Sequence, residues 1–166
     1  GPVQDALSES VRHFQRPLVA WLYLAFESQV PWREARFHIK PAGQSVRALV
    51  TIDEAFTQVV SLPREQRDLA DEWQRASYDV LGTAWLTLGL IVTTLPSGRV
   101  HVECHYNYDK DPGSWGPDDA PFTGEDLAFH LARFPGRAGR AVPDWMRERI
   151  VVDGLVDPGP RVEGVS

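Results

Sequence analysis

The chain has 166 residues, of which 43 % are hydrophobic and 24 % charged, and these proportions exclude disorder over the whole length. The formal net charge is −6, whereas a protein that binds a nucleic-acid backbone needs a basic face, so no nucleic-acid partner is expected. The single cysteine, Cys104, excludes an intramolecular disulfide and a multi-cysteine metal site.

The two ends of the chain are expected to lie outside the folded part. Residues 1–2 are interpreted as the remains of a cleaved tag, and residues 153–166 are expected to form a flexible tail. Residues 3–152 have about the size of one domain. The longest apolar runs, 18–26 and 88–92, are shorter than the ~20 residues of a membrane span, so no membrane partner is expected.

The first third of the chain predicts a helix followed by a β-hairpin. Residues 5–29 repeat apolar side chains at steps of three and four, as one face of a helix does. Pro17 inside this run is expected to kink the helix or to mark its first turn. Residues 33–39 and 44–52 alternate apolar and polar side chains around a turn signal and predict two paired strands, and 56–62 predict a shorter third strand. In the first strand Ala35, Phe37 and Ile39 face one way, and Arg36, His38 and Lys40 the other.

A second helix and a second hairpin follow. Residues 64–81 have one apolar face and predict the helix. Residues 85–95 are apolar and rich in β-branched side chains, and residues 99–109 alternate after a Pro-Ser-Gly turn. The face of the last strand that is expected to join the core carries Val100, Val102, Cys104, Tyr106 and Tyr108. The face that is expected to be exposed carries His101, Glu103, His105, Asn107 and Asp109.

The last third of the chain predicts a long loop and two helices. Residues 110–122 are rich in proline, glycine and acidic side chains, which is typical of a functional or disordered loop. Thr123 is placed to cap a helix over 124–134, and 143–150 predict a last short helix. The order of elements indicates an α+β fold, with an antiparallel β-sheet and helices packed on one face.

Acidic side chains are concentrated between residues 103 and 126. This segment holds one base, Lys110, and the seven acids Glu103, Asp109, Asp111, Asp118, Asp119, Glu125 and Asp126. The rest of the chain is neutral overall, so the whole imbalance falls on the exposed face of the last strand and the loop after it. One interpretation is a solvated edge, and the other is a docking surface for a basic partner, which the nearby aromatic side chains favour. Trp115 is the expected anchor, because no periodicity in its loop predicts burial.

An alternative function is metal binding. His101, Glu103 and His105 alternate along one strand and therefore share a face, and two histidines with one carboxylate form a known zinc ligand set. Three ligands spaced ~6–7 Å apart along one strand rarely meet a single ion without help from another element. Exposed polar residues on a sheet face are the plainer interpretation, and a metal-binding protein or metalloenzyme stays open as the alternative.

Two short motifs frame the second hairpin. They are Trp85-Leu-Thr87 at the start of the apolar strand and Tyr106-Asn-Tyr108-Asp109 at the end of its partner. An amphipathic helix over 64–82 precedes them, and Pro31-Trp32 leads into the first strand. In this order the motifs resemble those of the YezG/EsaG-like immunity proteins. The resemblance covers roughly residues 8–134.

The resemblance implies a cytoplasmic antitoxin that is not an enzyme and has no cofactor. Such proteins neutralise a cognate secreted toxin domain of a polymorphic or type VII system, for example a nuclease or an NAD-degrading enzyme, by occluding its active site. The lone cysteine is consistent with a reducing compartment. The residues expected to bind the toxin are Glu103, His105, Asn107, Asp109, Asp111, Trp115, Asp118 and Asp119. No catalytic residue and no metal ligand is assigned among them.

Overall fold

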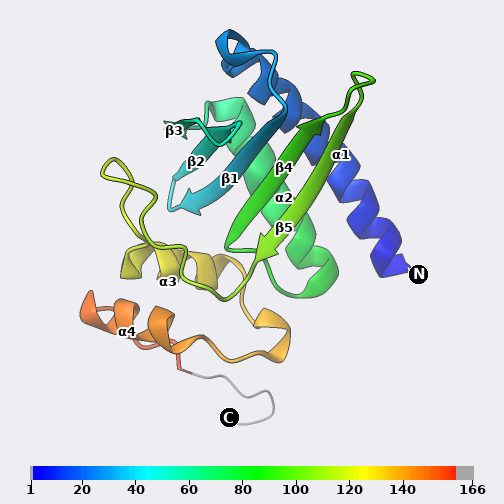
Figure 1. Ribbon diagram of the computed structural model, residues 1–166. Helices are drawn as coiled ribbons and strands as arrows, with labels where there is room; N and C mark the ends of the chain where they lie inside the picture. Colours follow the sequence, from blue (N-terminus) through cyan, green and yellow to red (C-terminus); the bar gives the residue numbers. More distant parts are fainter. Residues whose placement is uncertain (1, 160–166) are drawn as a thin grey trace.

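The computed structural model describes residues 2–159 and the side chains from residue 12 onward. It has an α+β fold with one antiparallel sheet in the strand order β3-β2-β1-β4-β5, which confirms the predicted fold class (Figure 1). The strands are β1 (Glu34–Ala42), β2 (Ser45–Ile52), β3 (Phe56–Ser61), β4 (Thr87–Thr94) and β5 (Val100–Asn107). The helices are α1 (Pro2–Ala25), α2 (Arg64–Leu81), α3 (Gly124–Arg133) and α4 (Asp144–Val152), with short 3-10 helices at Glu27–Gln29 and Arg137–Gly139.

Helices α1 and α2 cover one face of the sheet (Figure 1). Alternate residues of each central strand point toward them, so that β2 has an alternating burial pattern along its whole length, as its sequence predicts. Leu18 and Leu22 of α1 are fully buried against this face, and Phe14 stacks on Trp73 of α2 at a centroid distance of 6.0 Å. Helix α1 runs through Pro17, which therefore does not mark its first turn.

Strand β5 is an edge strand, and its expected core face is only partly covered. Val102, Cys104 and Tyr108 pack against the core, as predicted, but Val100 and Tyr106 are exposed. The prediction that this whole face joins the core is wrong at these two positions, because an edge strand has a neighbour on one side only.

Helices α3 and α4 form a second hydrophobic cluster below one end of the sheet (Figure 1). Its buried members are Leu86, Phe122, Leu127, Met146 and Ile150. Thr123 caps α3 as predicted, because its hydroxyl accepts from the backbone N–H of Asp126 while the Asp126 carboxylate accepts from the backbone N–H of Thr123. Only α1 and α2 thus lie on the sheet face itself.

Part of the expected C-terminal tail contacts these helices. The carboxylate of Asp153 accepts a hydrogen bond from the backbone N–H of Gly124 at 2.6 Å, and Asp157 pairs with Arg147 of α4. The rest of that segment, 160–166, and residue 1 of the expected tag lie outside the described residues. Within the described part of the chain, no helix is long and apolar enough to cross a membrane.

Gly124, at the start of α3, lies close against the C-terminal part of α4. A Cβ atom at this position would lie 2.5 Å from the carbonyl oxygen of Arg149 and 2.9 Å from Cβ of Asp153. We expect Gly124→Ala to lower the free energy of unfolding by about 1–3 kcal/mol, because α3 and α4 must separate to accept the methyl group. Denaturant titration measures the change. Glu125→Ala, at the neighbouring exposed position, is the control, and equal losses in the two variants would contradict this packing.

Candidate functional site

The second face of the sheet has no helix over it in the part of the chain that the structure describes (Figure 1). The strand register brings a row of side chains together across this open face. His38 of β1 pairs with Leu49 of β2 on one side and with Gly89 of β4 on the other, and Gly89 pairs with His105 of β5. Paired residues of neighbouring strands share a face, so the two histidines flank a glycine.

Gly89 makes the room that His38 occupies. A Cβ atom at Gly89 would lie 3.2 Å from Nδ1 of His38 and 3.7 Å from Cβ of His105. Partial burial lowers the pKa of His38, and the positive charges of Arg36 and of protonated His105 lower it further. His38 therefore holds a neutral imidazole on the open face at neutral pH.

Trp115 comes from the loop between β5 and α3 and lies beside His38, with a ring-centroid distance of 6.1 Å. On the other side of the row, Oε2 of Glu103 lies 3.3 Å from Nε2 of His105. The side chains of Glu103 and His105 are 55 % and 63 % exposed. We call these four residues, His38, Glu103, His105 and Trp115, the open-face site.

A buried ion pair holds the loop that carries Trp115. Nζ of Lys40 lies 2.6 Å from Oδ2 of Asp119, and neither side chain has any exposed surface. The same ammonium donates to the carbonyl oxygens of Ala120 at 2.9 Å and Gly113 at 3.4 Å, so its three N–H donors have three acceptors. A buried charge is tolerated when it is paired and fully hydrogen-bonded in this way.

The carboxylate of Asp119 also fixes the position of Trp115. Its Oδ2 accepts from the backbone N–H of Trp115 at 2.8 Å, and its Oδ1 lies 3.0 Å from a guanidinium nitrogen of Arg47. Nζ of Lys40 lies 4.8 Å from the centroid of the Trp115 ring, a cation–π distance. The ion pair, the backbone bond and the ring contact therefore place the indole against the open face of the sheet.

Three of the loop's predicted partner-binding acids are instead paired within the chain. Asp119 is buried, which contradicts its expected exposure. The carboxylate of Asp109 pairs with both Arg137 and Arg140, and Asp111 pairs with Arg149 at 2.6 Å. Burial opposes ionisation of Asp111, but hydrogen bonds from Arg149 and from the backbone N–H of Gly113 lower its pKa overall.

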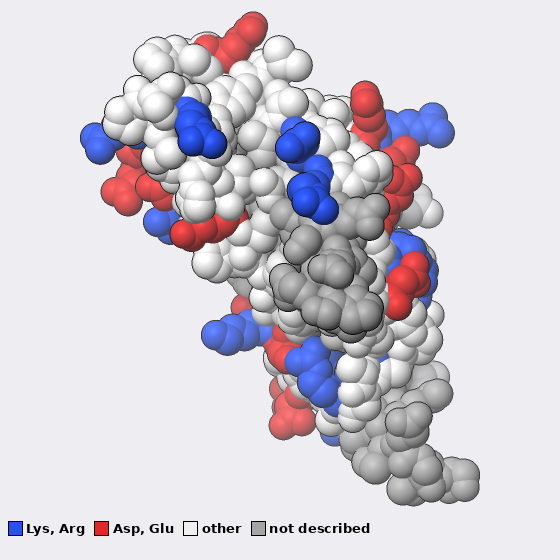
Figure 2. Space-filling model, turned by 90° about the vertical axis from the view of Figure 1, so that its right-hand side faces the viewer, with Lys and Arg blue, Asp and Glu red and all other residues white. Residues whose placement is uncertain are grey.

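The predicted acidic surface is therefore largely neutralised. Arginines from after the loop in sequence fold back onto its carboxylates, and basic and acidic side chains are interspersed on the side of the molecule seen in Figure 2. Asn107 also has an internal role, since its side chain bonds both backbone groups of Lys110 and the hydroxyl of Thr87. Asp118 remains an exposed acid. Of the eight predicted residues, the structure places Glu103 and His105 in contact on the open face, and it places Trp115 beside His38 on the same face.

Sequence reasoning missed Lys40, His38 and Gly89 as parts of this site. The signal for Lys40 is its rarity, because the chain has fifteen arginines and only two lysines. The bulky planar guanidinium of arginine does not substitute for a compact ammonium that is enclosed by three acceptors. Gly89 stands out as the one glycine within β4, where a glycine often marks a close approach of neighbouring groups.

The metal-ligand set proposed from the sequence lies on one face, as expected, but does not surround a common point. His101 and His105 approach opposite oxygens of Glu103, at 4.0 and 3.3 Å. Among the side chains that the structure describes, those of residues 12–159, no three His, Cys, Asp or Glu are grouped so as to hold a metal ion. Cys104 lies on the opposite face of β5, where burial raises the pKa of its thiol.

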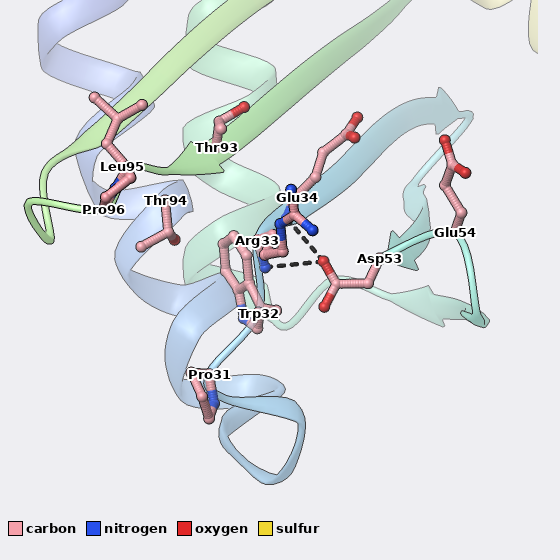
Figure 3. A pocket seen from close by; sticks show the side chains of 10 residues that line it. All are labelled: Pro31, Trp32, Arg33, Glu34, Asp53, Glu54, Thr93, Thr94, Leu95 and Pro96. Carbon is pink, nitrogen blue, oxygen red and sulfur yellow. Dashed lines mark hydrogen bonds between the residues drawn. The ribbon is translucent and has the colours of Figure 1, made fainter.

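A pocket of about 860 Å³ lies at the other end of the sheet, between the β2–β3 and β4–β5 turns (Figure 3). Oδ1 of Asp53 accepts there from the backbone N–H groups of Arg33 and Glu34, at 2.8 and 2.9 Å. These two hydrogen bonds hold the start of β1 against the β2–β3 turn, in which Asp53 and Glu54 both have positive φ. None of the partner-binding residues predicted from the sequence lines this pocket.

Comparison of the chain with protein-family models and with curated proteins found no match. The resemblance to the YezG/EsaG-like family therefore stays a prediction. Its motif residues have structural places in the hairpin: Trp85 is fully buried, and the hydroxyl of Thr87 accepts a hydrogen bond from the side chain of Asn107.

The two lysines of the chain provide a matched test of the buried ion pair. We expect Lys40→Met to lower the free energy of unfolding by about 3–5 kcal/mol, because it leaves Asp119 buried without its main counter-charge. Lys110→Met, at an exposed position, is expected to change it by less than about 0.5 kcal/mol. Chemical denaturation measures both. A Lys40→Met protein as stable as Lys110→Met would contradict the role of the pair.

Proposed function

We propose that this chain is an immunity protein that binds a secreted toxin domain through the open-face site and blocks that domain's active site. The observation that carries the proposal is the position of Trp115. Its loop is built around a buried ion pair, and its indole lies at the edge of an uncovered sheet face. The motif resemblance of the second hairpin supports the same function.

The loop suits tight binding because its shape does not depend on the partner. Internal bonds from Lys40, Asp119 and Asn107 fix the loop, so little conformational entropy remains to be lost on binding. Tryptophan is a frequent anchor of protein interfaces, and it is most effective when neighbouring contacts exclude water from it. The imidazole of His38 and the ammonium of Lys40 lie beside the indole and provide such neighbours.

The charge of the open-face site favours a basic partner. Glu103 is more than half exposed, and its contacts within the chain are histidines rather than arginines. A lysine or arginine from the substrate groove of a nuclease or a nucleotide-degrading toxin would pair with this carboxylate and approach the indole face. In this proposal the chain acts by stoichiometric occlusion and not by turnover.

The proposal requires that a neighbouring gene encode a secreted protein, and the binding surface is tested with the C-terminal domain of that protein. We expect a tight complex that suppresses the toxicity of that domain. Trp115→Ala is expected to weaken binding by more than about 2 kcal/mol, as truncation of an interface anchor does, and Glu103→Lys to weaken it at least about tenfold through charge repulsion. Titration calorimetry measures both affinities.

Glu72→Lys is the matched charge-reversal control, because Glu72 is exposed on α2, behind the opposite face of the sheet. Thermal unfolding of each variant separates loss of binding from loss of fold. If Glu72→Lys weakens binding and Glu103→Lys does not, the surface is wrong. If the wild-type chain neither binds nor protects, the immunity function is wrong.

A further inference from the structure

A second concave site lies between α3, α4, the chain that joins them and the segment after α4, which contributes Val156, Pro158 and Gly159. This pocket has a volume of about 310 Å³, which is at the lower end of the range for small-molecule sites. Its walls are mostly apolar and include Leu131, Phe134, Val142 and Ile150. It is separate from the open-face site, and the inference drawn from it does not depend on the proposed function.

Two arginines line this apolar pocket. Arg137 and Arg140 share one carboxylate, that of Asp109, which is the only acid paired with either of them in the part of the chain described. The pair of guanidinium groups therefore keeps one positive charge without a counter-charge. Burial, together with the charges of Arg137 and Arg133, lowers the pKa of His130 to about 4, so His130 adds no further positive charge at neutral pH.

Arg137 also carries an unused donor. The residue is only 5 % exposed, and its Nε has no hydrogen-bond partner among the described residues. Its backbone adopts φ of +46°, followed by +52° at Ala138, which is costly for residues with a side chain. The bond from the backbone N–H of Ala138 to the carbonyl oxygen of Gly82, at 2.8 Å, holds this turn in place. A strained turn thus keeps a guanidinium buried beside an apolar cavity, with one of its N–H groups unpaired.

We propose that this pocket binds an aliphatic monocarboxylate. The carboxylate would accept hydrogen bonds from Arg137 and Arg140 and supply the missing negative charge, and the alkyl chain would lie against the apolar wall made by α3 and α4. A guanidinium and a carboxylate match in geometry as well as in charge. A neutral or cationic ligand with the same alkyl chain would leave the charge excess as it is.

Octanoate, octanol and octylamine are the probes, titrated into the full chain by calorimetry. We expect octanoate to bind at least about tenfold more tightly than the other two, since it alone pairs with the guanidinium groups. In nitrogen-15 spectra the Nε resonance of Arg137 is expected to shift with octanoate only. Octanol binding as tightly as octanoate, or absence of octanoate binding, overturns the proposal without using any variant.

Two substitutions then test whether octanoate binds in this pocket. Ala132→Trp is expected to abolish octanoate binding by filling the pocket from an exposed position, and Arg140→Gln is expected to weaken it about fivefold or more. Ala55→Trp, at an exposed turn outside the pocket, is the matched control and should leave the affinity unchanged. Thermal unfolding checks that each variant is folded. Unchanged affinity in a folded Ala132→Trp protein would show that octanoate binds elsewhere.

Discussion

Lysine is among the residues least often buried, yet Lys40 of β1 has no exposed surface. Its ammonium is bonded by the loop between β5 and α3. Removing an ammonium and a carboxylate from water costs several kcal/mol for each ion, and their attraction repays this only when the geometry is good. Here the ammonium has three acceptors, and Asp119 is bonded in addition by Arg47 and by the backbone of Trp115. The pair is satisfied only when the loop lies on the sheet, so it selects one loop conformation.

The other features of the loop follow from this constraint. Once the middle of the loop is fixed, its two flanks bring Asp109 and Asp111 to arginines of the C-terminal third, and Trp115 comes to rest beside His38. The acidic side chains of the loop thereby connect it, through ion pairs, to the sheet and to the α3–α4 layer. The surface that remains free for a partner carries fewer unpaired acids than the charge count of the segment suggests. It includes Glu103, His105 and the indole of Trp115.

The fold was largely predictable from the sequence, and the site was not. Period-two and period-3.6 patterns located every strand and α-helix to within a few residues, and α2 at Arg64–Leu81 was predicted at its observed bounds. The same patterns correctly placed His38 and Lys40 on the face away from the core. They do not report pairing between distant residues: Asp119 meets Lys40 across 79 positions, and Asp111 meets Arg149 across 38. A count of charges along the chain therefore overstated the exposed acidity of the loop.

Acetylation of the native chain tests most directly whether the ion pair forms before any partner arrives. The chain has only two lysines, so peptide mass spectrometry can follow each one over time. A buried, paired amine reacts only when the structure opens, and we expect Lys40 to be acetylated at least about 100-fold more slowly than Lys110 in the native state and at a similar rate in denaturant. Comparable rates for the two lysines in the native protein would contradict the account.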